Sequence, residues 1–106
     1  MRRAKRESSA ADLRLGHLLR VNGDLEIAIL SMWMRSPRAK VMIGMAQASL
    51  RGEGPGGTDA DLLEKLRPLV IEAREFYADD DFPAAMARMR VAHDLVGLRI
   101  ISVGKG

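Results

Sequence analysis

The segment Asp24-Leu-Glu-Ile-Ala-Ile-Leu-Ser-Met-Trp-Met34 decides the fold class. Its apolar residues have the spacing of one helix face, formed by Leu25, Ala28, Ile29, Met32 and Trp33. The opposite side is apolar as well, with Ile27, Leu30 and Met34. A helix that is apolar on nearly every side is enclosed by its own chain or covered by a second chain. We therefore expect this helix at the centre of the structure, with Trp33 and Met34 at an interface.

Start and stop signals place a helix on each side of this segment. Ser9 and Asp12 have the spacing of a capping box and predict a helix start. Asn22-Gly23 predicts the end of that helix, because both residues tolerate the left-handed backbone that ends helices. Further along, Ser36-Pro37 predicts a new helix that continues to about Leu50, since proline is well tolerated in a first helical turn.

The segment Gly52-Glu-Gly-Pro-Gly-Gly57 separates the two halves of the chain. Its four glycines and one proline predict a flexible connector. The segment has no Gly-Lys-Ser/Thr ending and no strand is expected before it, so we do not expect a phosphate-binding loop.

Two further helices are predicted after the connector. Thr58 and Asp61 form a second capping box, and an apolar stripe at helical spacing follows them. Pro68 lies inside this stripe and is expected to kink the helix or divide it. Asp81 is expected to cap a last helix that continues to about Ile101.

The absence of sustained polar–apolar alternation predicts an all-α chain. With 106 residues, the chain is long enough for one domain with its own core. We expect antiparallel helical hairpins or a bundle of four to six helices over residues 9–104, preceded by a basic arm at residues 1–8.

A weak internal repeat relates the first and last helix pairs. Leu15-Gly16-x-x-Leu19 followed by Gly23-Asp24-Leu25 is matched by Ala73-x-x-Phe76 followed by Asp80-Asp81-Phe82. In both copies an alanine and a methionine then occupy corresponding positions, Ala28 and Met32 in the first and Ala85 and Met89 in the second. The repeat predicts two helical hairpins whose helices touch at small residues.

The first copy resembles a tetratricopeptide repeat, which places Leu-Gly in its first helix and a Gly-Asp turn before its second. The resemblance implies a tetratricopeptide-like fold and a protein-binding groove lined by the first helix of each hairpin. On this chain the implied groove residues are Leu13, His17, Arg20, Arg67, Val70, Arg74 and Tyr77. Three arginines, a histidine and a tyrosine would suit an acidic peptide or a carboxylate terminus.

A second motif points to different chemistry. His93-Asp94-Leu95-Val96-Gly97 resembles the phospho-acceptor helix of one histidine-kinase dimerisation family. Only thirteen residues follow His93, too few for the second long helix of that family. The chain therefore lacks room for that kinase domain, but a histidine phosphotransfer protein that uses His93 is kept as an alternative function.

Composition and charge narrow the function classes further. The chain has no cysteine, and its two histidines have no metal-ligand spacing, so neither a metal site nor another cofactor is expected. No apolar run approaches the ~20 residues of a membrane span, and a cytoplasmic location is the default expectation. The net charge is +3, and residues 1–8 are basic, which leaves nucleic acid as an alternative partner.

The sequence contains no catalytic signature, so we do not expect an enzyme. The prediction is a non-catalytic protein-interaction or adaptor module that forms a homo-oligomer. The alternatives are a small regulatory protein that contacts nucleic acid through its basic arm, and the phosphotransfer protein.

Overall fold

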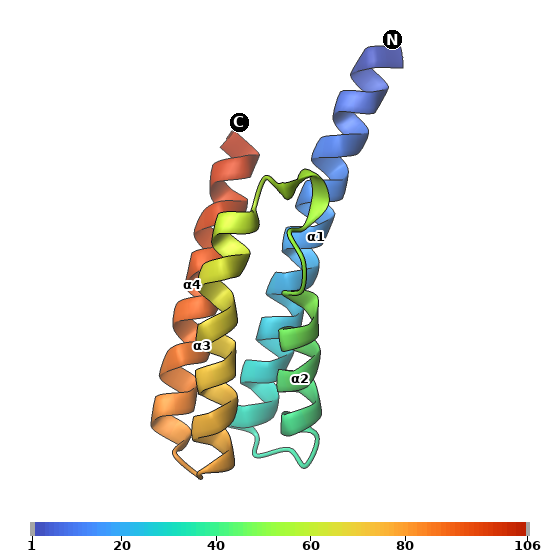
Figure 1. Cartoon of the computed structure of the whole chain (residues 1–106). Coiled ribbons are helices and arrows are strands. Elements are labelled where there is room, and N and C mark those ends of the chain that lie inside the picture. Colours follow the sequence, from blue (N-terminus) through green and yellow to red (C-terminus); the bar gives the residue numbers. More distant parts are fainter. Residues whose placement is uncertain (1, 106) are drawn as a thin grey trace.

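The computed structural model describes the backbone of residues 2–105 and the side chains of residues 9–105. Four α-helices make up most of it: α1 (Arg2–Trp33), α2 (Ala39–Ser49), α3 (Ala60–Ala78) and α4 (Phe82–Lys105), with a short 3-10 helix η1 (Pro55–Gly57) before α3. Successive helices run in opposite directions along a bundle about 54 Å long and 22 Å wide (Figure 1). The described residues contain no strand, and the prediction of an all-α bundle is confirmed.

Helix α1 continues through Asn22-Gly23, so the helix end predicted there is wrong. Asn22 does not end the helix but donates a 2.8 Å hydrogen bond from Nδ2 to Oε1 of Glu26, one turn on. A glycine inside a helix costs about 1 kcal/mol relative to alanine, which is less than full burial of a single leucine contributes. Val21 and Leu25, on either side of the glycine, are both fully buried. The turn of the first predicted hairpin is therefore absent.

The helix start predicted at Ser9 is also wrong, because α1 already includes this residue. The basic arm predicted at residues 1–8 has its side chains outside the described part of the structure. The backbone of residues 2–8 belongs to α1.

The predicted second hairpin is present as α3, a short turn and α4. The Oδ1 atom of Asp81 accepts a 3.3 Å hydrogen bond from the backbone N–H of Ala84, which confirms the predicted cap. Pro68 lies inside α3 without dividing it, although it removes one backbone hydrogen bond. The buried residues Leu66 and Val70 on either side of the proline hold the helix against the core.

Two helix starts are shifted from their predicted positions. Ser36 accepts a 3.1 Å hydrogen bond at Oγ from the N–H of Arg38, as a capping residue does, but α2 begins only at Ala39. At the start of α3 the flanking residue is Asp59 rather than the predicted Thr58. The side chain of Asp59 is bound by arginines and makes no capping hydrogen bond.

The core is built from aliphatic and methionine side chains of all four helices. The large residues with no exposed surface include Leu18, Leu25, Met32, Ile43, Leu63, Leu66, Val70, Met89 and Val96. Five fully buried alanines, Ala28, Ala46, Ala73, Ala85 and Ala92, allow the helices to approach closely. Each fully buried large aliphatic side chain stabilises the fold by about 1.5–3 kcal/mol before entropy costs. None of the described helices is long and apolar enough to cross a bilayer.

Candidate interaction surface

The seven residues predicted to line a groove do not share one opening. Leu13 is 66% exposed and lines a hollow beside Pro55 and Gly56 at the connector end of the bundle. Tyr77 lines a different hollow at the opposite end, beside Ser36 and Pro37. The connector and the turn between α1 and α2 lie toward opposite ends of the bundle (Figure 1), so Leu13 and Tyr77 line separate surfaces.

Val70 is fully buried in the core, so its prediction as a partner-binding residue is wrong. Its position in the apolar stripe of α3 faces the bundle interior, where a partner cannot reach its side chain. His17 is half-buried against Gly54, and its Nδ1 atom is buried with no hydrogen-bond partner among the described residues. Arg20 is exposed.

The two arginines of α3 contact helix α2 and the connector. Arg67 donates from Nε to the carbonyl oxygen of Leu50 at 2.9 Å and from Nη2 to that of Gly52. These bonds satisfy carbonyl groups at the end of α2. Arg74 donates from Nη1 to Oε1 of Gln47 at 2.9 Å. Arg67 thus binds the residues that follow α2, and Arg74 binds α2 itself. Whether a partner also contacts Arg74 or the other exposed residues stays a prediction.

A charged cluster that the sequence analysis missed joins α1, α4 and the start of α3. Asp59 is only 1% exposed, and both its carboxylate oxygens accept hydrogen bonds from Arg14, at 2.9 and 2.8 Å. Arg99 adds a 2.9 Å bond to Asp59 and binds Asp61 through two nitrogens, at 3.2 and 2.8 Å. The cluster fixes the connector end of the bundle.

These contacts shift the acidity of the two carboxyl groups. The hydrogen bonds from Arg14 hold the pKa of Asp59 below its usual value, against the opposing effect of burial. The paired hydrogen bonds from Arg99 lower the pKa of Asp61 to about 2. The cluster is thus fully ionised near neutral pH and its charges are mutually satisfied, which suits a structural role more than proton transfer.

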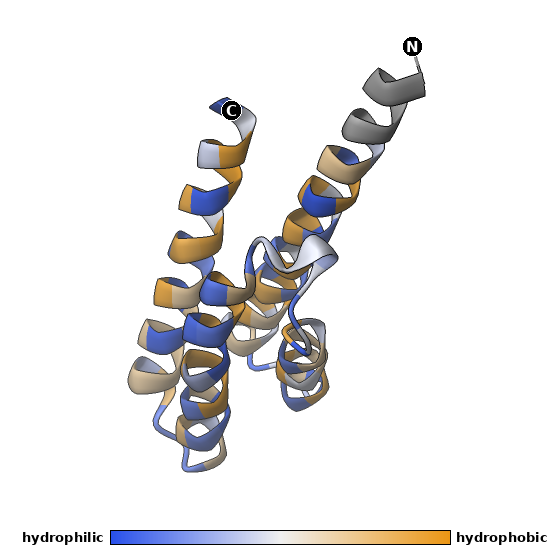
Figure 2. Cartoon of the chain, turned by 45° about the horizontal axis from the view of Figure 1, so that its top comes forward, coloured by the Kyte–Doolittle hydropathy of each residue, from blue (hydrophilic) through white to orange (hydrophobic). Residues whose placement is uncertain are grey.

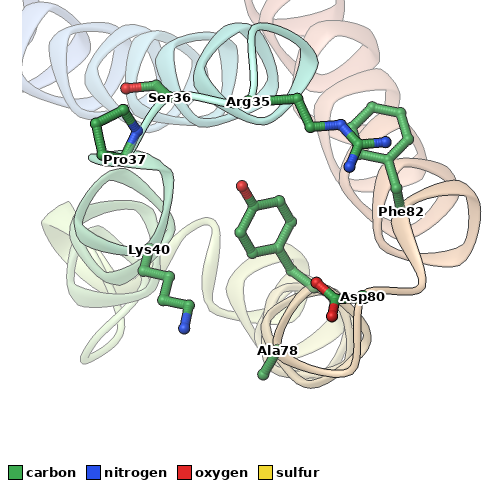
Figure 3. Close-up of a pocket in the computed structure, with 8 residues that line it drawn as sticks. Arg35, Ser36, Pro37, Lys40, Ala78, Asp80 and Phe82 are labelled. Atoms are coloured by element: carbon green, nitrogen blue, oxygen red, sulfur yellow. The ribbon is translucent and has the colours of Figure 1, made fainter.

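A polar hollow of about 400 Å³ lies at the end of the bundle where α1 meets α2 and α3 meets α4 (Figure 3). Arg35 places its guanidinium 4.7 Å from the centre of the Phe82 ring, and Lys40 lies across the hollow from that ring. Arg35 and Asp80 both have left-handed backbone, with φ of 55° and 60°. Each lies two positions beyond the last residue of a helix, where this backbone is common, so their conformation has a structural explanation.

An exposed apolar surface runs along α1 and α4. Leu30 and Trp33 of α1 are 56% and 63% exposed, and Leu98 and Ile101 of α4 are 65% and 56% exposed. We call this surface the α1–α4 face, and it includes the residues that line the three hollows described next. The hydropathy colouring shows apolar residues along both helices (Figure 2).

Three shallow hollows follow one another along the α1–α4 face. The middle one, of about 430 Å³, is lined by Glu26, Ile29, Leu30, Trp33, Arg90, His93 and Asp94. It shares Trp33 and Arg90 with a hollow of about 320 Å³ near Pro83, and His93 and Asp94 with one of about 410 Å³ near Ile101. Because neighbouring hollows share lining residues, they form one groove along α4, and α1 borders the two hollows that Trp33 lines.

His93 lies within this groove and is held by α1. Its Nε2 atom is 3.1 Å from Oε1 of Glu26, and its side chain is 33% exposed. Hydrogen bonds from His93 and from Asn22 lower the pKa of Glu26. Nε2 of His93 is thus paired across the helix interface, and the use of His93 as a phosphate acceptor stays a prediction.

Comparisons of the chain with protein-family models, curated proteins and solved structures find no significant match. Among the described residues, no group of three or more His, Asp or Glu side chains lies close enough to hold a metal ion. A functional conclusion must therefore come from the geometry and chemistry of the surfaces described above.

Proposed function

We propose that this protein is a non-catalytic interaction module that associates with itself through the α1–α4 face. The observation that carries the proposal is the exposure of Leu30, Trp33, Leu98 and Ile101 on two adjacent helices, each more than half exposed. Scattered apolar residues are normal on a protein surface, but a contiguous patch rimmed by charges is typical of an interaction site.

The chemistry of the groove supports a protein partner. Its lining combines aliphatic side chains and a tryptophan with the charged residues Glu26, Arg90 and Asp94. Tryptophan and arginine are the residue types that dominate binding energy at protein interfaces. Covering apolar surface contributes about 25 cal/mol per Å², which favours a partner that follows the length of the groove.

The prediction that Trp33 and Met34 contact a partner is part of this proposal. Trp33 lies on the α1–α4 face, and Met34 follows it at the end of α1 with 68% of its surface exposed. In the described chain the Trp33 ring has one aromatic neighbour, Phe82, with ring centres 6.4 Å apart.

Sedimentation equilibrium of matched variants tests the proposal. The unmodified protein is expected to form a dimer at about 50 μM, a range where interfaces of modest size associate. Leu30→Glu places a charge in the groove and is expected to give a monomer. Val41→Glu is the control, because Val41 is 59% exposed on α2, away from the α1–α4 face. A monomeric unmodified protein, or equal effects of the two variants, would contradict the proposal.

A further inference from the structure

One face of α4 has a pattern that is symmetric along the helix. Six residues recur at steps of four, three, four, three and four positions: Pro83, Ala87, Arg90, Asp94, Gly97 and Ile101. This is the spacing, although not the apolar composition, of the seam of a two-helix coiled coil. None of the six belongs to the buried core, and all of them line the hollows of the α1–α4 face.

The seam pairs with a reversed copy of itself. When a second α4 lies antiparallel with its midpoint at Ala92, Arg90 faces Asp94, Ala87 faces Gly97, and Pro83 faces Ile101. We propose that two copies of this chain pack α4 against α4 in this antiparallel register. The inference rests on the proposed self-association. It adds which helix forms the contact, the relative direction of the two helices and the residues that face each other.

Charge complementarity selects this direction. Neither Arg90 nor Asp94 has an ion-pair partner among the described residues, although both are exposed on the same face. In the antiparallel register each arginine meets the aspartate of the other copy, twice per dimer. A parallel arrangement would instead bring Arg90 against Arg90 and Asp94 against Asp94, and like charges at an interface disfavour binding.

Small residues allow the two helices to approach. A Cβ atom added to Gly97 would meet no heavy atom within 4 Å, so the space above this glycine is open in one copy. The residue that the register places there is Ala87, the smallest side chain in the seam after glycine. Ala87 faces Gly97 on both sides of the central Arg90–Asp94 pairs. Because both residues are small, the two helix axes can come close there.

The ends of the seam are apolar and explain the exposure of Ile101. The register brings Ile101 of the second copy to the level of Pro83, beside the hollow of about 320 Å³ that Trp33, Phe82 and Met86 also line. The contact from residue 83 to residue 101 is about 27 Å long at 1.5 Å per residue. Leu98 lies next to the seam and is covered at its edge.

Single cysteines test the register directly, because the natural chain has none. We expect an equimolar mixture of Ala87→Cys and Gly97→Cys proteins to form a mixed disulfide under mild oxidation, seen as a covalent dimer by intact mass. Ala87→Cys alone is expected to cross-link much more slowly, since two copies of residue 87 would be about 15 Å apart. Ala48→Cys on the exposed side of α2, mixed with Gly97→Cys, is the control and should not cross-link.

The outcomes separate the two proposals. A protein that sediments as a dimer but cross-links as readily through Ala87→Cys alone would overturn the antiparallel register and leave self-association intact. A protein that sediments as a monomer would overturn both. Efficient cross-linking of Ala87→Cys with Gly97→Cys, together with no cross-linking of Ala48→Cys with Gly97→Cys, would support the register.

Charge reversal gives an independent test that does not depend on thiol chemistry. Arg90→Glu alone and Asp94→Arg alone each create two like-charge pairs per dimer, and each is expected to weaken self-association at least about tenfold. Mixed together, the two variants place opposite charges in every pair and should form a heterodimer. Lys65→Glu, on an exposed position of α3, should leave self-association unchanged. A mixture that stays as weak as its components would overturn the register.

Discussion

At the residue scale, the cluster around Asp59 is the most consequential interaction outside the apolar core. Asp59 is almost fully buried, and its charge is balanced by two arginines whose side chains are only 28% and 24% exposed. A buried carboxylate is stable only when its oxygens are paired. Removing the charge of Asp59 leaves Arg14 without its acidic partner, whereas Arg99 keeps Asp61.

Asp59→Asn is expected to lower the free energy of unfolding by about 2 kcal/mol, less than for a fully buried pair because both arginines reach solvent. Urea denaturation followed by circular dichroism measures the change. Asp79→Asn, at an exposed position after α3, is the control and should be nearly neutral. Equal effects of the two substitutions would show that the cluster does not hold the connector end.

The same cluster predicts a loss of stability in acid. The folded-state pKa values of Asp59 and Asp61 are lowered, that of Asp61 to about 2, whereas an unfolded aspartate has a pKa of about 3.9. Their contribution is therefore complete above about pH 5 and is lost as the pH falls toward 2. The melting temperature, measured from pH 6 to pH 2.5, should fall less steeply in the Asp59→Asn variant. A parallel pH dependence in both proteins would contradict this assignment.

Nothing in local sequence reveals this cluster. Arg14 and Arg99 lie 45 and 40 residues from Asp59 along the chain, and each is one of many arginines. Periodicity reports on which face of a helix is apolar, but it carries no information on which distant charges meet. Val70 shows the same limit, because a predicted groove position became a core position once α3 was packed against its neighbours.

At the element scale, the small residues at the helix contacts carry the packing of the bundle. Ala28 on α1 and Ala85 on α4 have no exposed surface. Replacing either by leucine overpacks a joint that has no room and should lower stability by about 1–3 kcal/mol. Ala48→Leu, on the exposed side of α2, is the control and should be nearly neutral. Chemical denaturation that finds equal, small effects at all three positions would contradict close packing at these alanines.

The turn between α3 and α4 contains a residue, Asp80, whose backbone conformation costs conformational free energy. Asp80 has φ of 60°, a conformation that glycine adopts without penalty. Asp80→Gly is therefore expected to stabilise the protein by about 0.5–1 kcal/mol. Asp79 precedes it with φ of −89°, so Asp79→Gly should give no such gain. A loss of stability from Asp80→Gly, measured by urea denaturation, would show that the aspartate side chain has a stabilising contact in the turn.

Most helices were predictable from the sequence, whereas two boundaries predicted inside α1, a start at Ser9 and an end at Asn22-Gly23, were wrong. Apolar spacing and capping residues placed α2, α3 and α4 within a few residues of their observed ends. The false stop at Asn22-Gly23 arose because local turn preference amounts to about 1 kcal/mol, while the buried residues on both sides contribute several. Tertiary burial therefore decided the length of α1.

At the scale of the whole molecule, four helices bury a common core yet leave the α1–α4 face uncovered. The α3 side of α4 is closed by packing and by an ion pair between Arg88 and Glu72, with Nε and Oε2 3.3 Å apart. The other side of α4 carries the symmetric seam and the exposed aliphatic residues. This asymmetry supports the proposed self-association through the α1–α4 face.

The fluorescence of the single tryptophan tests the central claim most directly, because Trp33 lies on the α1–α4 face and is 63% exposed in one copy. The emission maximum is measured while the protein is diluted from about 100 μM to about 0.1 μM, a range that spans interfaces of micromolar affinity. A second copy on this face excludes water from Trp33, so the emission maximum should move to longer wavelength on dilution. An emission maximum that is constant over the whole range, with a monomer in solution throughout, would contradict self-association through the α1–α4 face.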